Sequence, residues 1–172
     1  MKSDNPFIIQ FSGLKDGKHD FQLNVEPKFF EQNDFWNDIT GNLVVDLELD
    51  KRPNMLVLQF QIIGIITVPC DICSAPLNVD LTIEEELFVK FGNENYQETD
   101  EIIFLPESEY EIDLKPQIFE FISLSLPMKK IHKEGECDEE MIQTINKYKR
   151  GNEEQNDEID PRWAALKNIK NN

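Results

Sequence analysis

Hydrophobic and polar residues alternate along much of the first half of the chain, and a period of two predicts β-strands. The alternation is clearest after Asn42, where every second position is aliphatic: Leu43, Val45, Leu47 and Leu49. Residues 51–54 then form a predicted turn, and residues 55–68 run back as a long, mostly apolar strand. The pattern therefore predicts a long β-hairpin.

Shorter runs predict further strands on both sides of this hairpin. Residues 7–11 and 19–25 should form an N-terminal hairpin around a turn at 15–18. Residues 27–31 should form a short helix that places two aromatic side chains on the sheet. After the long hairpin, three more extended segments follow: 77–91, 102–105 and 110–113. The last two should be edge strands.

The hydrophobic spacing becomes helical after Asp113. This residue should cap a helix that has Pro116 in its first turn and is stopped by Pro127. The helix should pack across the sheet through side chains at helical spacing: Ile118, Phe119, Ile122 and Leu126. A second, more polar helix is predicted within residues 137–149.

These elements predict an α+β fold. A mainly antiparallel β-sheet, or a partly open barrel, should carry a packed helix in the C-terminal half and a short C-terminal helix. Residues 1–150 should form a single domain, and the charged, amide-rich residues 151–159 an acidic flexible linker. Residues 160–172 should form a docking helix, because Asp160 suits the cap position and a helix this short is marginal alone.

The chain is strongly acidic, with a formal net charge of −17 from 34 acidic and 17 basic residues. Such a surface repels nucleic-acid phosphates over most of its area. Residues 84–113 contain eleven carboxylates and a single cation, Lys90. This region suits a basic protein partner better than RNA, although acidic runs also simply keep a protein in solution.

The sequence also predicts where the protein resides. Its first residues lack the layout of a secretory signal, and no apolar run has the length of about 20 residues that a membrane span needs. Three cysteines are an odd number for a disulfide framework. We therefore predict a cytoplasmic protein with reduced thiols and no membrane association.

Two of the three cysteines, Cys70 and Cys73, lie in one tight turn after the long apolar strand. A C-x-x-C pair can bind a metal, exchange electrons as a dithiol, or remain as two reduced thiols. The redox role requires the pair at the start of a helix, and Pro76 followed by a strand pattern argues against one.

Metal binding requires more ligands, and the chain offers His132 and Cys137 beyond the predicted helix. Together with Cys70 and Cys73 they would form a closed Cys3His set of the structural zinc type. The competing interpretation is that these residues are reduced cysteines and an exposed histidine without a metal. Residues alone leave both interpretations open.

Three segments of the chain, in this order, resemble the YceD family, whose members are called large ribosomal RNA subunit accumulation proteins. They are the cysteine turn, the run Tyr110-Glu111-Ile112-Asp113-Leu114 with the Leu-Pro motif that ends at Pro127, and the closing Asp160-Pro161-Arg162-Trp163. The resemblance implies a bacterial ribosome-biogenesis factor that supports large-subunit (23S) ribosomal RNA and has no established catalytic residues. It also implies a second cysteine pair after the Leu-Pro motif, where this chain has His132 and Cys137 instead.

A factor for ribosomal RNA with this net charge must contact it locally or through another protein. Lys129, Lys130 and Lys133 form one basic cluster that could contact RNA phosphates, and Lys147, Lys149 and Arg150 form a second. The charge favours the indirect route, in which acidic strands hold a basic ribosomal or assembly protein.

Two other functions remain as alternatives. One is a metal-dependent hydrolase or nuclease that uses the thiols with Glu134, Glu136 and Asp138. The other is an acidic adaptor unrelated to ribosomes. The sequence shows no phosphate-binding glycine loop and no nucleophile that can be paired with a histidine, so we predict that the protein is not an enzyme.

Overall fold

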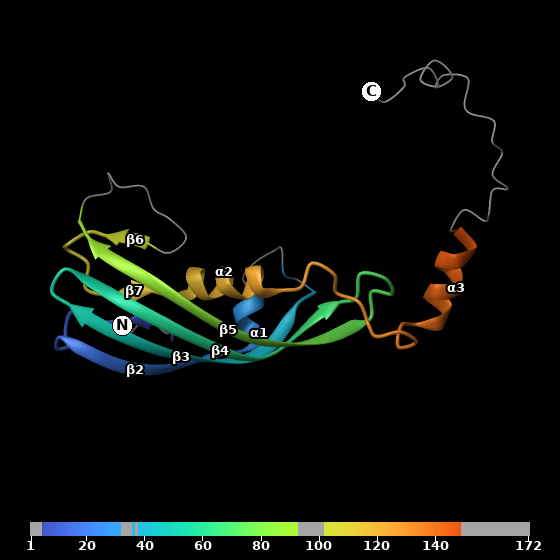
Figure 1. The fold of residues 1–172 in the computed structure, drawn as a ribbon, viewed down its shortest axis with the longest axis horizontal. Coiled ribbons are helices and arrows are strands. Elements are labelled where there is room, and N and C mark those ends of the chain that lie inside the picture. The colour runs from blue at the N-terminus through green and yellow to red at the C-terminus, as the bar shows by residue number, and fades with distance from the viewer. Residues whose placement is uncertain (1–4, 32–35, 37, 93–101, 149–172) are drawn as a thin grey trace, which may run out of the picture.

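The computed structural model describes residues 5–31, 36, 38–92 and 102–148. A long five-stranded sheet forms most of the fold (Figure 1), in the order β2 (Gly17–Val25), β3 (Thr40–Arg52), β4 (Met55–Pro69), β5 (Pro76–Phe91) and β6 (Ile102–Leu105). Neighbouring strands are antiparallel, except that β6 pairs parallel to β5. A separate two-stranded sheet joins β1 (Ile8–Ile9) and β7 (Ile112–Asp113). The predicted α+β class is confirmed, and the sheet is not closed into a barrel.

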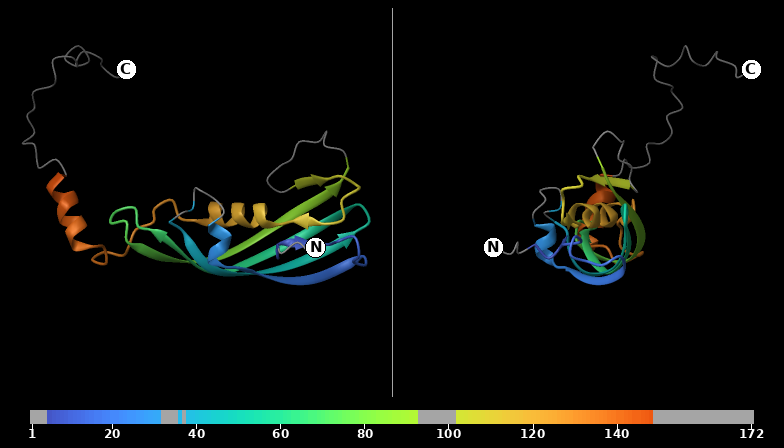
Figure 2. Two further views of the ribbon diagram at one scale, coloured as in Figure 1. Left: turned by 180° about the vertical axis from the view of Figure 1, so that it is seen from behind. Right: turned by 90° about the vertical axis from the view of Figure 1, so that its left-hand side faces the viewer.

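Three helices lie in the described part of the chain: α1 (Pro27–Phe30), α2 (Lys115–Ser125) and α3 (Glu139–Tyr148). The end-on view in Figure 2 shows the sheet curled around α2. This helix buries Ile118, Phe121 and Ile122, and the Phe121 ring meets the Phe60 ring of β4 at 5.2 Å between centroids. The predicted helix that crosses the sheet is therefore confirmed.

The predicted hairpin over residues 43–68 is also confirmed. Strands β3 and β4 stay in register from Thr40 opposite Thr67 to Arg52 opposite Met55, which leaves a two-residue turn. The short helix α1 places Phe29 and Phe30 in the core, as predicted, and Phe30 stacks on Trp36 at 5.6 Å. Alternating apolar side chains thus form one face that α1 and α2 cover.

The predicted N-terminal hairpin is wrong. Strand β2 pairs with β3 over its whole length, whereas β1 spans only Ile8–Ile9 and pairs with β7. Because β3 is much longer than β1, pairing with β3 gives β2 nine paired residues. This pairing places Leu23 and Val25 in the buried core. Meanwhile Lys51 donates hydrogen bonds from Nζ to the carbonyls of Phe11 and Leu14, which holds the connecting loop against β3.

Two expectations at the start of α2 also need correction. Of the two predicted edge strands, residues 102–105 do form the edge of the large sheet. Within residues 110–113, only Ile112–Asp113 form a strand, β7, and it belongs to the small sheet. Leu114 occupies the N-cap position without a side-chain capping hydrogen bond, and its side chain is fully buried in the core. Asp113 lies one residue earlier, where its carboxylate accepts a hydrogen bond from the Lys115 amide at 2.9 Å.

The last described element, α3, confirms the polar helix predicted within residues 137–149. It has no buried residue and lies beyond the cysteine turn in Figure 1. The predicted linker 151–159 and docking helix 160–172 lie outside the described residues. None of the helices that the structure describes combines the length and the apolar character needed to cross a lipid bilayer.

Candidate metal centre

The cysteine turn connects β4 to β5 and is closed by its own backbone. The Cys70 amide donates to the Ala75 carbonyl at 2.9 Å, and the Ser74 amide donates to the Cys70 carbonyl at 2.9 Å. Ser74 has a positive φ of 58°, which lets the chain reverse direction at the end of the turn. The Ile72 amide approaches the Cys70 sulfur at 3.5 Å, so the turn supplies a donor to a thiolate.

A reciprocal contact holds the segment after α2 against this turn. The Asp71 amide donates to the Lys130 carbonyl at 2.6 Å, and the Lys130 amide donates to Asp71 Oδ2 at 2.7 Å. The Lys130 ammonium lies 3.6 Å from Asp71 Oδ1. Sequence reasoning missed Asp71, although a carboxylate between two cysteines in a turn is a signal for such a clamp. The contact places His132 and Cys137 over the cysteine turn.

The structure brings all four predicted ligand residues together. One ligand atom from each of Cys70, Cys73, His132 and Cys137 lies within 4.8 Å of the others. His132 Nδ1 lies 3.4 Å from the Cys73 sulfur and 3.8 Å from the Cys137 sulfur, and the sulfurs of Cys70 and Cys137 are 3.9 Å apart. A tetrahedral zinc ion, with metal–sulfur bonds of about 2.3 Å, places sulfur ligands about 3.8 Å apart. These side chains could therefore hold one metal ion with little movement.

The histidine ring is oriented for metal binding. Its Nε2 lies 3.1 Å from the Pro76 carbonyl, which can only accept a hydrogen bond, so Nε2 carries the proton. The Nδ1 lone pair then faces the sulfurs. This hydrogen bond and the nearby Cys70 thiol raise the pKa of His132 above its ordinary value. A carbonyl that fixes the ring in this way is common behind metal-binding histidines.

The three thiols have unequal acidity. Burial raises the pKa of Cys70, but the amides of Cys73, Ile72 and His132 stabilise its thiolate and lower the pKa to about 6. The Asp138 amide is the main cause that lowers the pKa of Cys73. Burial and then the other two thiols raise the pKa of Cys137 to about 11. Negative charge thus concentrates on the cysteine turn.

We expect the Cys70 thiol of the metal-free protein to ionise near pH 6, measured by thiolate absorbance in the ultraviolet. Because folding lowers the pKa of Cys70 from 9.0 to about 6, this ionisation stabilises the fold fully above pH 9.0 and loses its effect as the pH falls through 6. Cys70→Ser should abolish the step, and Cys137→Ser should retain it. Identical titrations of the wild-type protein and Cys70→Ser would contradict this assignment.

The model of the family described as large ribosomal RNA subunit accumulation protein YceD matches residues 58–170. This chain belongs to the YceD family. The matched region covers most of the chain and contains the four clustered residues. Searches of curated proteins and of solved structures found no match for this YceD protein.

The lysines next to the centre of this YceD protein are not equivalent. Lys129 and Lys133 are exposed, whereas Lys130 is half-buried and pairs with Asp71. The side chains of Lys129 and Lys133 are therefore more accessible to solvent than that of Lys130.

The acids of the hydrolase alternative do not join the cluster. Within the described residues, the one group of possible metal ligands contains three cysteines and His132 but no carboxylate. Glu134 and Glu136 are exposed, and Asp138 accepts a hydrogen bond from the Met141 amide at 2.8 Å at the start of α3. Sequence reasoning assigned Asp138 to chemistry and missed its position as a helix cap, which its place before Glu139 indicates.

Proposed function

We propose that this protein is a non-enzymatic ribosome-biogenesis factor that acts in the cytoplasm and supports the accumulation of large-subunit (23S) ribosomal RNA. The observation that carries this proposal is the match to the YceD family over residues 58–170. The description of that family names ribosomal RNA accumulation and no enzymatic activity.

The same proposal includes one structural zinc ion bound by Cys70, Cys73, His132 and Cys137. Soft thiolate and imidazole ligands suit zinc, and four protein ligands leave no position for an exchangeable water. The ion would fasten the segment after α2 to the β4–β5 turn across a long stretch of sequence. The spacing of the ligand atoms and the orientation of His132 support this role.

A closed coordination shell also argues against the hydrolase and nuclease alternative. Metal-assisted hydrolysis needs a water on the metal, and a nuclease needs a basic groove for phosphates. Glu134 and Glu136 face solvent outside the ligand set.

We further propose that the protein acts on the ribosome through a basic ribosomal or assembly protein. A net charge of −17 attracts such a partner and repels RNA. The exposed Lys129 and Lys133 could add local contacts to phosphates, whereas Lys130 is engaged with Asp71.

Depletion of the protein should lower the ratio of large-subunit to small-subunit ribosomal RNA, because the large subunit would fail to mature. The measurement is quantification of both RNAs in depleted cells, with wild-type protein re-expressed as the control. An unchanged ratio would refute the proposed function and favour an adaptor unrelated to ribosomes.

A further inference from the structure

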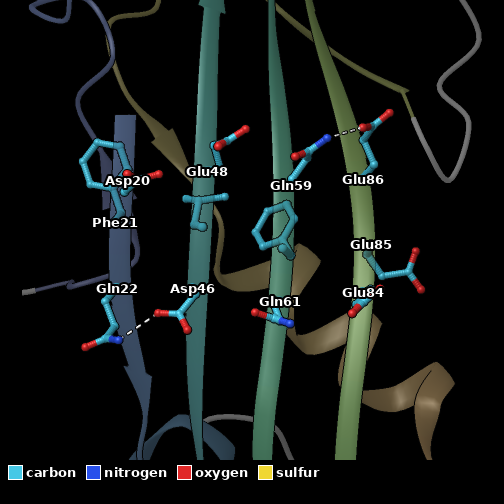
Figure 3. A pocket seen from close by; sticks show the side chains of 12 residues that line it. Asp20, Phe21, Gln22, Asp46, Glu48, Gln59, Gln61, Glu84, Glu85 and Glu86 are labelled. Carbon is cyan, nitrogen blue, oxygen red and sulfur yellow. Dashed lines mark hydrogen bonds between the residues drawn. The ribbon is translucent and has the colours of Figure 1, made fainter. Parts of the chain in front are cut away.

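The face of the large sheet that points away from α2, called the outer face below, carries two rows of polar side chains across β2–β5 (Figure 3). Paired positions place Asp20, Glu48, Gln59 and Glu86 in one row. The adjacent row is Gln22, Asp46, Gln61 and Glu84. These rows border a hollow of about 850 Å³.

The charge of the outer face is unbalanced. No lysine or arginine lines the hollow, although six carboxylates do. Asp20 lies directly opposite Glu48, and like charges at paired positions destabilise a sheet. One cation reaches the rows from the side, where Lys18 pairs with Glu48 at 2.6 Å. The folded protein alone therefore leaves most of this negative charge uncompensated.

An exposed aliphatic patch adjoins the two rows on the same face. Val44 pairs with Ile63, one row beyond Asp46 and Gln61, and Ile65 follows Ile63 on β4. Their exposed fractions are 39% for Val44, 47% for Ile63 and 48% for Ile65. Three contiguous exposed aliphatic side chains in the middle of a sheet do not help to keep a protein in solution. Exposed apolar patches of this kind mark interaction surfaces.

We propose that the outer face docks a lysine- and arginine-rich polypeptide segment, whose cations meet the two acidic rows and whose apolar residues cover Val44, Ile63 and Ile65. This inference rests on the proposed function and identifies the surface that the basic partner uses. Charge complementarity selects this occupant. RNA would bring phosphates against carboxylates, and a second copy of the chain would bring carboxylates against carboxylates.

The test compares two full-length variants with equal net charge. The outer-face variant carries Asp46→Asn, Glu84→Gln and Glu86→Gln. The control variant carries Glu107→Gln, Glu109→Gln and Glu111→Gln, which lie between β6 and β7. The new amides retain oxygen acceptors for Gln22 and Gln59, which bond Asp46 and Glu86 at 2.8 and 2.9 Å, so the outer-face variant should fold. Thermal unfolding of both variants checks this.

The binding probe is a labelled peptide in which Lys and Arg alternate with Val. Its binding is measured by fluorescence anisotropy. We expect the outer-face variant to bind it about tenfold more weakly than the wild-type protein, and the control variant to lose less than about twofold. A peptide with Ser in place of Val should bind the wild-type protein more weakly, because the aliphatic patch then has no partner. Equal losses in the two variants would show attraction to net charge alone and would overturn the proposal.

The same variants separate this inference from the proposed function in depleted cells. If depletion lowers large-subunit RNA and only the outer-face variant fails to restore it, the docking surface is supported. If that variant restores the RNA as fully as the control, the surface assignment is overturned while the proposed function stands. Binding of a large-subunit RNA fragment to this face, or wild-type dimers that the outer-face variant abolishes, would also overturn it. If depletion leaves the RNA unchanged, the proposed function itself fails.

Discussion

Replacing Cys73 with serine should reduce bound zinc from about one ion per chain to a small fraction of that value. The variant removes a buried thiolate ligand 3.4 Å from His132 Nδ1, and a serine hydroxyl is a poor ligand for this ion. The measurement is the metal content of the purified protein by mass spectrometry.

The same substitution should release the segment after α2 from the cysteine turn. Without the ion, the segment would be held by hydrogen bonds such as the Asp71–Lys130 contact and the bond from His132 to the Pro76 carbonyl, and its amides should lose protection from hydrogen exchange. The sheet should remain folded, because α2 packs on it through Ile118 and Ile122, which are fully buried and are not among the ligands. Zinc at about 1,000 times its Kd would stabilise the wild-type fold by about 4 kcal/mol, and this increment should disappear.

Ile72→Ser is the matched control for these effects. Ile72 lies between the two cysteines in the same turn, but its side chain is 38% exposed and offers no ligand atom. The control variant should bind as much zinc as the wild-type protein. Full zinc content in Cys73→Ser, or no zinc in wild-type protein purified from zinc-containing medium, would refute the proposed centre.

The cluster of Cys70, Cys73, His132 and Cys137 was predictable from sequence because its residue types are scarce. The chain contains three cysteines and two histidines, so a site with soft ligands had few possible compositions. His19 lies in a segment with the alternating pattern of a strand, and in the structure it lies in β2 with its Nε2 2.8 Å from the Lys15 carbonyl oxygen. The position of Asp71 between the two cysteines signals a contact in the turn, but its partner Lys130 was not predictable, because contacts between distant segments leave no periodic signal.

The hairpin of β3 and β4 was predictable because its alternation is local and its turn is short. The partner of β1 was not, because Ile8 and Ile9 could extend any free edge, and their pairing with β7 depends on how residues over 100 positions away fold. The outer face shows the same limit. Alternating acids on β2, β3 and β5 are visible in the sequence, but only the register aligns Asp20, Glu48 and Glu86 into one row.

Gly64→Ala should destabilise the fold by about 3 kcal/mol or more, which is among the largest effects expected of a single methyl group. A Cβ at Gly64 would clash with the Asn42 carbonyl oxygen and would lie 2.6 Å from Leu43 Cα. Both obstacles are backbone atoms of β3, so no side chain can rotate away. Strands β3 and β4 would have to separate at a point where Leu43 is buried in the core.

The measurement is urea unfolding, with Gly13→Ala as the control. No atom lies within 4 Å of a Cβ built at Gly13, so that variant should change the free energy of unfolding by less than about 0.5 kcal/mol. The two substitutions add the same methyl group, and the difference between them isolates the backbone approach at Gly64. Equal unfolding midpoints would mean that β3 and β4 do not come this close, which would also weaken the alignment of Val44 with Ile63 on the outer face, because both depend on the same register.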